Sequence, residues 1–376
     1  MDYPDLLLFT NAMIHAGRLN SYRSLKWTHN WYADDTFDIV VNRNRTNVDS
    51  LAEGGFIGFP STLGDGGWNI GCVDSIQKVQ TRGKSSELWT ASGRGVESVL
   101  QKRRCLHAWA TGDGYDTQVA EAELNMRHYV DVEVINPTDT DRAMAGITLE
   151  TVHSPELGVA IEYKARMQEL PEVLYDHCKQ AGLSFGLVWS GTGVNFLFSI
   201  YAGTDRSTGV TKVTLSANFG NVKEYDYLYS TLDQRNLVYV GGAGDGAART
   251  LVDVHSGATP TGWNREETFV DALECTETDE LTAKGNQVLA ERGATQTLDF
   301  TFKESPSFTI GTDFFLGDTV EVEFPDVATM ISRITKITER YDRNGRNYEI
   351  GVGKSKPDFV SILKAQNKKI NRLSTR

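Results

Sequence analysis

Apolar residues occupy every second position in several short segments of the chain, which is the pattern of half-buried β-strands. In residues 36–44, Phe37, Ile39 and Val41 follow this alternation, and residues 318–324 repeat it with glutamates between the valines. Glycine-rich turns separate most of these runs. Further strands are predicted in residues 54–60, 68–80, 87–93, 183–190, 194–203, 210–222, 226–231, 236–240 and 331–353.

Apolar residues spaced three and four apart predict four helices between the strands. The second begins at Asp116, a favourable N-cap residue. The third has Pro171 in its first turn and Gly182 as its stop, and the fourth stops at Gly293. Strands come first, helices next and strands again, so the predicted fold class is α+β and β-rich, not alternating βαβ. The helices are expected in residues 95–105, 116–134, 165–182 and 276–293.

The composition is that of a folded, acidic protein. The 376 residues are 40% hydrophobic, and this length allows two or three domains with a sizeable core. The formal net charge of −12 argues against a protein that binds the phosphates of nucleic acid, because a phosphate-binding surface needs clustered Lys and Arg. The longest apolar run near the start is Leu6 to Phe9, so neither a signal peptide nor a membrane span is predicted.

A glycine cluster follows the predicted strand at residues 236–240. Gly242, Gly244 and Ala247 have the G-x-G-x-x-A spacing of a dinucleotide-binding turn. That turn must open a helix whose N-terminus holds the pyrophosphate, whereas the residues that follow alternate like a strand. Gly242, Gly244 and Gly246 are therefore predicted to turn the chain between two strands. A P-loop lysine is missing as well, and no cofactor is expected.

Two carboxylate pairs stand out, Asp34–Asp35 and Glu266–Glu267. Two carboxylates that face each other across a cleft would suit a glycosidase. The favoured interpretation is that both pairs are exposed and solvated. The seven tryptophans have no spacing typical of a sugar-binding platform and are predicted to be core and interface residues.

Two cysteine–histidine neighbours, Cys105 with His107 and His177 with Cys178, could supply a nucleophile and a base. Adjacent side chains on a helix point about 100° apart, so a buried thiol beside a partly exposed histidine is favoured. The four cysteines form no C-x-x-C pair, and neither a metal site nor a disulfide framework is predicted. No catalytic or metal-binding constellation emerges, and the chain is predicted not to be an enzyme.

Asn344-Gly345 lies between two strand-like runs near the end of the chain. Both residues tolerate positive φ, so they are predicted to form the centre of a type I′ hairpin turn.

A set of short sequence segments, in a fixed order along the chain, resembles a known protein family. They include RSLKWTHNWYADDTFDIVV, GGFIGFP, GCVDSIQKVQ, LWTASGRGVESVLQKRRC, AEAELNMRHYV, NLVYVGGAGDGAAR and FLGDTVEVEF. Together they are similar to the tail-tip hub proteins of long-tailed bacteriophages, especially the hub-like minor tail proteins of siphoviruses. The resemblance covers roughly residues 20–355.

The resemblance implies two β-barrel-like hub domains with inserted helical or mixed α+β segments. It implies a turn at Gly317 and Asp318 that enters a barrel strand, and Glu321 and Glu323 on that strand become candidate lumen-facing acids. The implied segments are a first hub segment with its following helix (1–115), a mixed α+β middle segment (116–205), a second hub segment with an inserted helix (206–355) and a basic tail (356–376).

The function implied by the resemblance is structural: a homotrimeric baseplate hub in the virion, located at the tail tip. It would join the distal tail or tail-tube protein to other tip or fibre proteins. DNA would pass through without specific binding, because an acidic lumen repels phosphates. Two alternatives remain open at this point, a cell-wall or polysaccharide hydrolase and a carbohydrate-binding adhesin of the tail tip.

Overall fold

The computed structural model describes residues 4–45, 47–61, 63, 67–80, 87–108, 112, 114–273, 275, 277–302, 308–324, 327–343 and 345–353. The chain divides into two compact units. Unit 1 comprises Met1–Tyr225 and Asp299–Val352, and unit 2 comprises Asp226–Leu298 and Gly353–Arg376. Strands dominate and helices are few, so the predicted α+β, β-rich class is confirmed. The predicted segment boundaries at residues 115, 205 and 355 stay predictions.

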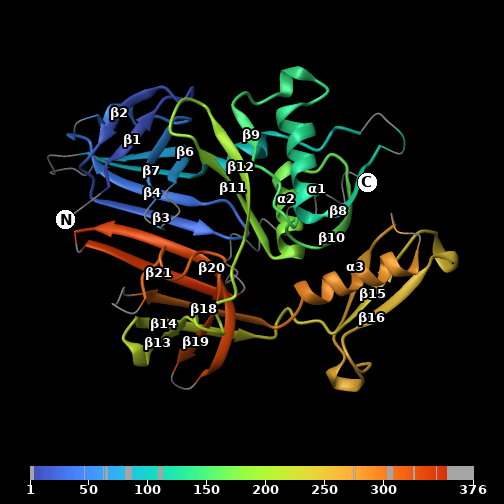
Figure 1. Cartoon of the computed structure of the whole chain (residues 1–376). Coiled ribbons are helices and arrows are strands. Elements are labelled where there is room, and N and C mark those ends of the chain that lie inside the picture. Colours follow the sequence, from blue (N-terminus) through green and yellow to red (C-terminus); the bar gives the residue numbers. More distant parts are fainter. Residues whose placement is uncertain are drawn as a thin grey trace. The chain divides into compact units, whose positions relative to one another are not determined.

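One large sheet contains thirteen strands. Eleven of them follow the order β14-β18-β21-β20-β3-β4-β7-β6-β5-β1-β2, and β13 and β19 join through β20 (Figure 1). Among the described residues no strand pairing closes this order into a barrel. The strands are β1 (Leu6–Phe9), β2 (His15–Leu19), β3 (Ser24–Asn30), β4 (Thr36–Asn42), β5 (Phe56–Pro60), β6 (Trp68–Val79), β7 (Leu88–Gly95), β13 (Thr214–Ser216), β14 (Val222–Ser230), β18 (Thr295–Phe302), β19 (Thr319–Phe324), β20 (Val327–Asp342) and β21 (Gly345–Gly353).

Aromatic residues fill the core on one face of this sheet. The Trp27 ring stacks on Phe37 with centroids 5.0 Å apart, and Phe59 meets Trp27 edge-on at 5.3 Å. A Cβ on Gly71 would lie 2.6 Å from the Phe37 ring, so only glycine allows this close packing.

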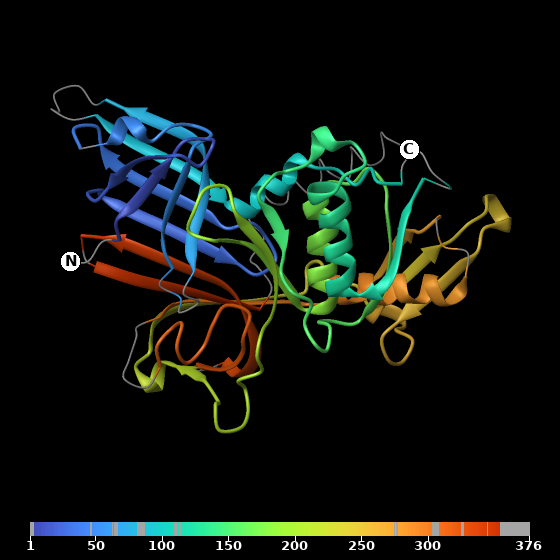
Figure 2. The same cartoon turned by 45° about the horizontal axis from the view of Figure 1, so that its top comes forward.

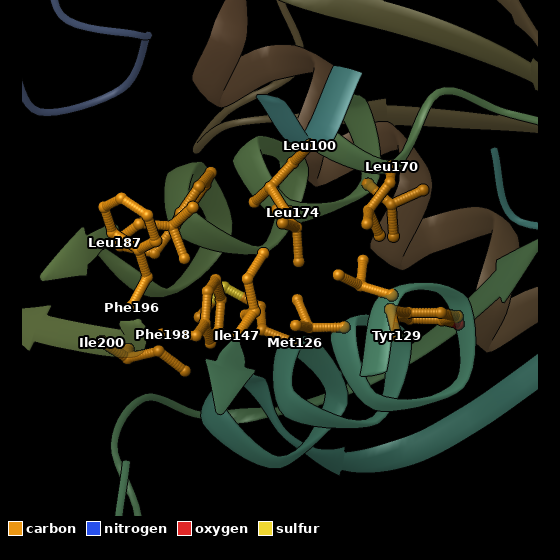
Figure 3. Close-up of a cluster of buried hydrophobic side chains, with 14 of the residues drawn as sticks. Leu100, Met126, Tyr129, Ile147, Leu170, Leu174, Leu187, Phe196, Phe198 and Ile200 are labelled. Carbon is orange, nitrogen blue, oxygen red and sulfur yellow. The ribbon is translucent and has the colours of Figure 1, made fainter. Parts of the chain in front are cut away.

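A mixed α+β segment supplies the second core of unit 1. Helices α1 (Ala122–Val130) and α2 (Leu170–Ala181) lie side by side, and a π-helical turn, η3 (Asp131–Ile135), extends α1 (Figures 1 and 2). Figure 3 shows apolar side chains of the helices, among them Met126 and Leu174, gathered in one cluster with side chains of the strands such as Phe198. The strands are β8 (Asp116–Glu121), β9 (Ile147–Leu149), β10 (Ala160–Ala165), β11 (Leu183–Trp189) and β12 (Phe196–Ala202).

The described part of unit 2 has a small sheet with the order β16-β15-β17, on which helix α3 (Thr278–Glu291) packs against β15 and β16. Val238, Val240 and Val254 of the sheet pack with Leu281 of the helix in one buried cluster. The strands are β15 (Leu237–Gly241), β16 (Leu251–His255) and β17 (Glu267–Asp271).

Most of the predicted elements form, but the strand predicted across residues 210–222 is reduced to β13, and two predicted helices differ. The segment that begins at Asp116 is a strand before it is a helix, so the prediction of a helix cap there is wrong. Strand β8 pairs with β10, from Asp116 opposite Ala165 to Glu121 opposite Ala160. Its partner lies about forty residues away and leaves no local signal. The predicted helix at residues 95–105 is a short 3₁₀ helix, η2 (Val96–Lys102). The remaining 3₁₀ turns are η1 (Val48–Ser50), η4 (Thr140–Arg142), η5 (Ala217–Phe219), η6 (Gly246–Ala248) and η7 (Gly262–Asn264).

Candidate functional site

The glycine cluster of unit 2 lies between two antiparallel strands, β15 and β16. The Gly242 N–H donates to the Thr250 carbonyl at 2.9 Å, Gly244 has φ 111° and Gly246 has φ 53°. Of these glycines, Gly246 opens η6, a turn of three residues, so the helix that a dinucleotide site requires does not follow the cluster.

Gly317 and Asp318 form a buried turn immediately before β19. The Asp318 carboxylate accepts hydrogen bonds from the Thr204 N–H at 2.8 Å and from the Phe315 N–H at 3.0 Å. It also pairs with Arg206 Nε at 2.6 Å. Because Asp318 is only 3% exposed, this carboxylate fixes the turn by satisfying donors from Phe315 of the turn itself and from the segment of residues 204–206.

Glu321 and Glu323 lie on the face of β19 opposite to its buried valines, and both are half-buried. Glu321 pairs with Lys212 Nζ at 2.6 Å and accepts a hydrogen bond from Thr214. The hydrogen bond from Lys212 is the main reason that the pKa of Glu321 is lowered. Glu323 has no ion pair with any residue that the structure describes, so its charge is the less compensated of the two.

The last hairpin joins β20 to β21, with Asp342 opposite Gly345. Gly345 has φ 105°, and a Cβ there would meet nothing within 4 Å. In this register Gly345 is the first residue of β21. Asn344 lies outside the described residues.

The cysteine–histidine neighbours do not form nucleophile–base pairs. Cys105 and Cys178 are buried, and burial raises the pKa of both thiols. His177 is also buried, its Nδ1 lies 2.8 Å from the Val173 carbonyl oxygen, and burial lowers its pKa. A thiolate nucleophile requires the opposite shift of a cysteine pKa.

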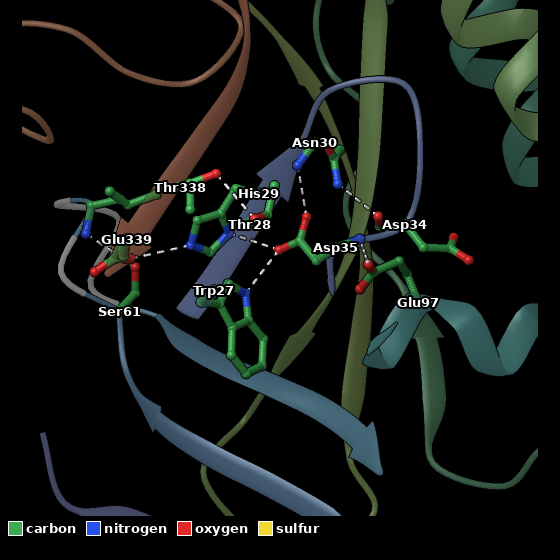
Figure 4. Close-up of polar contacts among 11 residues, drawn as sticks. Trp27, Thr28, His29, Asn30, Asp34, Asp35, Ser61, Glu97, Thr338 and Glu339 are labelled. Atoms are coloured by element: carbon green, nitrogen blue, oxygen red, sulfur yellow. Dashed lines mark hydrogen bonds and ion pairs between the residues drawn. The ribbon is translucent and has the colours of Figure 1, made fainter. Parts of the chain in front are cut away.

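A buried polar network at the turn between β3 and β4 was not anticipated from the sequence. Asp34 and Asp35 are half-buried there, so the prediction that this pair is exposed is wrong, whereas Glu266 and Glu267 are exposed as predicted. The network is shown in Figure 4. The sequence signal that could have identified it is a run of Trp27, His29, Asp34 and Asp35 in which the polar groups border a core strand.

Asp35 is the centre of this network. Its Oδ2 lies 2.7 Å from Nδ1 of His29 and accepts the indole N–H of Trp27 at 3.2 Å. Its Oδ1 accepts the Asn30 N–H at 2.9 Å, and its own N–H donates to Glu97 Oε1 at 2.7 Å.

The other side of His29 faces strand β20. His29 Nε2 lies 3.2 Å from Oε1 of Glu339, which is fully buried, and the Tyr341 hydroxyl donates to the second oxygen of Glu339 at 2.7 Å. Burial alone would lower the pKa of His29, but the charges of Asp35 and Glu339 and their hydrogen bonds outweigh burial. They raise the pKa from 6.5 to about 10, so the imidazolium form lies between two carboxylates.

Asp34 connects the network to the helices. The Tyr175 hydroxyl of α2 donates to Asp34 Oδ1 at 2.8 Å, and the Gln101 side chain of η2 donates to the other oxygen. The Trp31 carbonyl in the same turn accepts the Ser184 hydroxyl of β11 at 2.7 Å. The turn therefore holds the mixed α+β segment and the sheet of unit 1 together.

The arginines near η2 are engaged in ordinary structural contacts. Arg94 pairs with Asp74 at 2.6 Å, Arg103 donates to the Arg142 carbonyl at 2.7 Å and Arg104 pairs with Glu169 at 3.2 Å.

Within the described residues, no group of three or more His, Cys, Asp or Glu side chains is arranged to hold a metal ion. Over the same part of the chain, no helix has both the length and the apolar character needed to cross a bilayer.

Comparisons with known proteins identify the fold. A tail protein from Neisseria meningitidis MC58 matches with a TM-score of 0.58 at 15% identity, over 94% of this chain and 97% of that one. The 43 kDa tail protein of prophage MuSo2 from Shewanella oneidensis matches with a TM-score of 0.61 at 14% identity, over 93% and 98%. Prophage tail protein gp18 from Listeria monocytogenes EGD-e matches with a TM-score of 0.57 at 12% identity, over 98% and 99%.

At these identities the likeness is one of fold. No curated protein matches the sequence. The family model described as Siphovirus ReqiPepy6 Gp37-like protein matches residues 5–354, which is nearly the whole chain. The expected resemblance to siphovirus tail proteins is thereby confirmed. The chain belongs to the siphovirus ReqiPepy6 Gp37-like protein family, and its fold is that of phage tail proteins.

Proposed function

We propose that this protein is a structural component of the phage virion: a homotrimeric hub at the tail tip that joins the tail tube to tip components and lines the DNA exit channel. The observation that carries the proposal is the extent of the shared fold, since the three tail proteins above cover 93–98% of the chain. Because tail proteins share the fold over nearly the whole length of this chain, the fold supports a role in tail architecture.

The open strand order of the thirteen-stranded sheet supports self-association. Strands β14 and β2 end its strand order, and exposed edge strands are prone to pair with other chains. Head-to-tail contacts between copies generate a ring when the rotation closes. In such a ring of three copies, these two end strands would face neighbouring copies.

The charge of the chain supports passage of DNA. A trimer would carry a formal charge of three times −12, that is −36. Duplex DNA carries one negative charge per roughly 1.7 Å of its axis, and a basic channel would bind it through counterion release. In the proposed hub, acidic groups such as Glu323 face the channel and leave the DNA hydrated and mobile.

The decisive experiment measures the mass of the native assembly. Three copies of a 41.7 kDa chain give 125.1 kDa by native mass spectrometry, and antibody labelling of virions should decorate the tail tip. A monomer at all concentrations, or label along the tail shaft, would refute the hub. Lysis of peptidoglycan in a zymogram would favour the hydrolase instead, and saturable glycan binding would favour the adhesin.

A further inference from the structure

The network around Asp35 joins four elements of unit 1 through ionisable groups. The β3–β4 turn supplies Asp34 and Asp35, η2 supplies Glu97, β3 supplies His29 and β20 supplies Glu339 (Figure 4). Two carboxyl groups, of Asp35 and Glu339, thus flank the His29 imidazole, and two more, of Asp34 and Glu97, lie next to Asp35. Like charges in such a site favour retention of protons, because each ionised carboxylate destabilises its neighbours.

Glu97 lies where the neighbouring carboxylates repel its ionised form directly. Its carboxyl group folds back over Gly95, where a Cβ would lie 2.1 Å from Glu97 Oε1. The same oxygen accepts a hydrogen bond from the Asp35 N–H, so the Glu97 side chain binds the turn between β3 and β4. Burial raises the pKa of Glu97 from 4.5 to about 8, and the charges of Asp35 and Asp34 add to the shift.

We propose that the Glu97–Asp35–His29–Glu339 chain is a proton-operated latch that holds the turn of residues 31–35 against η2 and β20. The latch is closed when Glu97 is neutral and His29 is the imidazolium. It is released when these two groups lose their protons, because anionic Glu97 then faces Asp34 and Asp35, and neutral His29 no longer compensates Glu339.

The direction of the pH dependence follows from linkage. The pKa of Glu97 is higher in the closed state than in an opened state, so its stabilising effect is complete below pH 4.5 and is lost as pH rises towards about 8. The pKa of His29 is also raised, so its effect is complete below pH 6.5 and is lost as pH rises towards about 10. Both groups loosen the turn in the alkaline direction.

The surrounding groups leave a window in which Glu97 can be observed. Burial raises the pKa of Cys72 to about 12 and raises the pKa of Tyr175 well above its usual value, so neither ionises below pH 8. The pKa of Asp34 is raised by burial and contributes in the same direction as Glu97. The other charged or titratable groups that face the latch are Asp74, Arg94, Lys102 and Tyr341.

Hydrogen exchange of residues 31–35 in the full-length protein tests the latch. After correction for the intrinsic exchange rate, the opening equilibrium of the wild-type turn should rise at least about tenfold per pH unit from pH 5 to 6, where His29 stays mostly protonated in both states and contributes little. Glu97→Gln mimics the neutral acid. It should lower the slope of the logarithm of the opening equilibrium constant against pH by about one. His29→Gln should keep that slope and lose the further rise from pH 6.5 upward.

Glu53→Gln is the matched control, because Glu53 is an exposed glutamate of the same unit, and it should leave the slope unchanged. A wild-type turn whose protection does not change between pH 5 and 8 would overturn the proposal. So would a Glu97→Gln protein that keeps the wild-type slope. The wild-type measurement decides the question even where a variant fails to fold.

Discussion

Replacing Gly317 with alanine should destabilise unit 1 far more than the same change at Gly345. Both glycines have positive φ, 91° and 105°. A Cβ on Gly317 would lie 2.1, 2.3 and 2.5 Å from three carbons of the Trp31 ring, whereas a Cβ on Gly345 would meet nothing within 4 Å. The pair therefore separates the cost of the backbone conformation from the cost of the collision.

The expected magnitudes follow from these distances. A left-handed conformation costs alanine about 1–2 kcal/mol, which is the whole effect at Gly345. Carbon atoms in contact sit about 3.5–4.0 Å apart, so the new methyl at Gly317 requires Trp31 to move by more than an ångström. Trp31 is 3% exposed, and its backbone is held by Ser184 and Thr335. Overpacking of this kind adds about 1–3 kcal/mol, giving a total of about 2–5 kcal/mol for Gly317→Ala.

Urea denaturation followed by tryptophan fluorescence measures both variants. Six of the seven tryptophans belong to unit 1 and only Trp263 to unit 2, so the signal reports mainly on unit 1. Gly317→Ala should lower the unfolding midpoint clearly more than Gly345→Ala and should shift the emission of Trp31. Equal losses at the two positions would refute the collision with Trp31.

Two further predictions concern buried polar and sulfur groups. Asp318→Asn breaks a buried ion pair with Arg206 and should lower the free energy of unfolding by about 3–5 kcal/mol. The control Asp5→Asn breaks an exposed ion pair and should lower it by less than about 1 kcal/mol. Similar losses for the two variants in urea titrations would contradict the burial argument. Cys105 and Cys178 should stay unmodified by a thiol reagent at pH 8 until denaturant is added, because burial disfavours their thiolate forms. Mass spectrometry measures the labelling, and rapid labelling of both cysteines in the native protein would contradict this prediction.

Local signals in the sequence were sufficient where the structure depends on neighbouring residues. Helix α2 ends at Gly182 with φ 71°, as the glycine stop predicts. Strand β19 buries Val320 and Val322 in the alternation predicted for it. The hairpin of β11 and β12 and the strand–turn–strand unit at Gly244 have the same local origin.

The sequence by itself determined many of the strands, such as β4 and β19, and the stop of helix α2, because these properties depend on side-chain periodicity and on allowed φ values nearby. The tertiary structure alone decided which strands pair and which charges are buried. Strand β8 takes its conformation from β10, and His29 meets Glu339 across 310 positions of sequence. Such contacts bring distant groups into a shared region of low polarity, and the resulting shifts of charge have no counterpart in the order of residues along the chain.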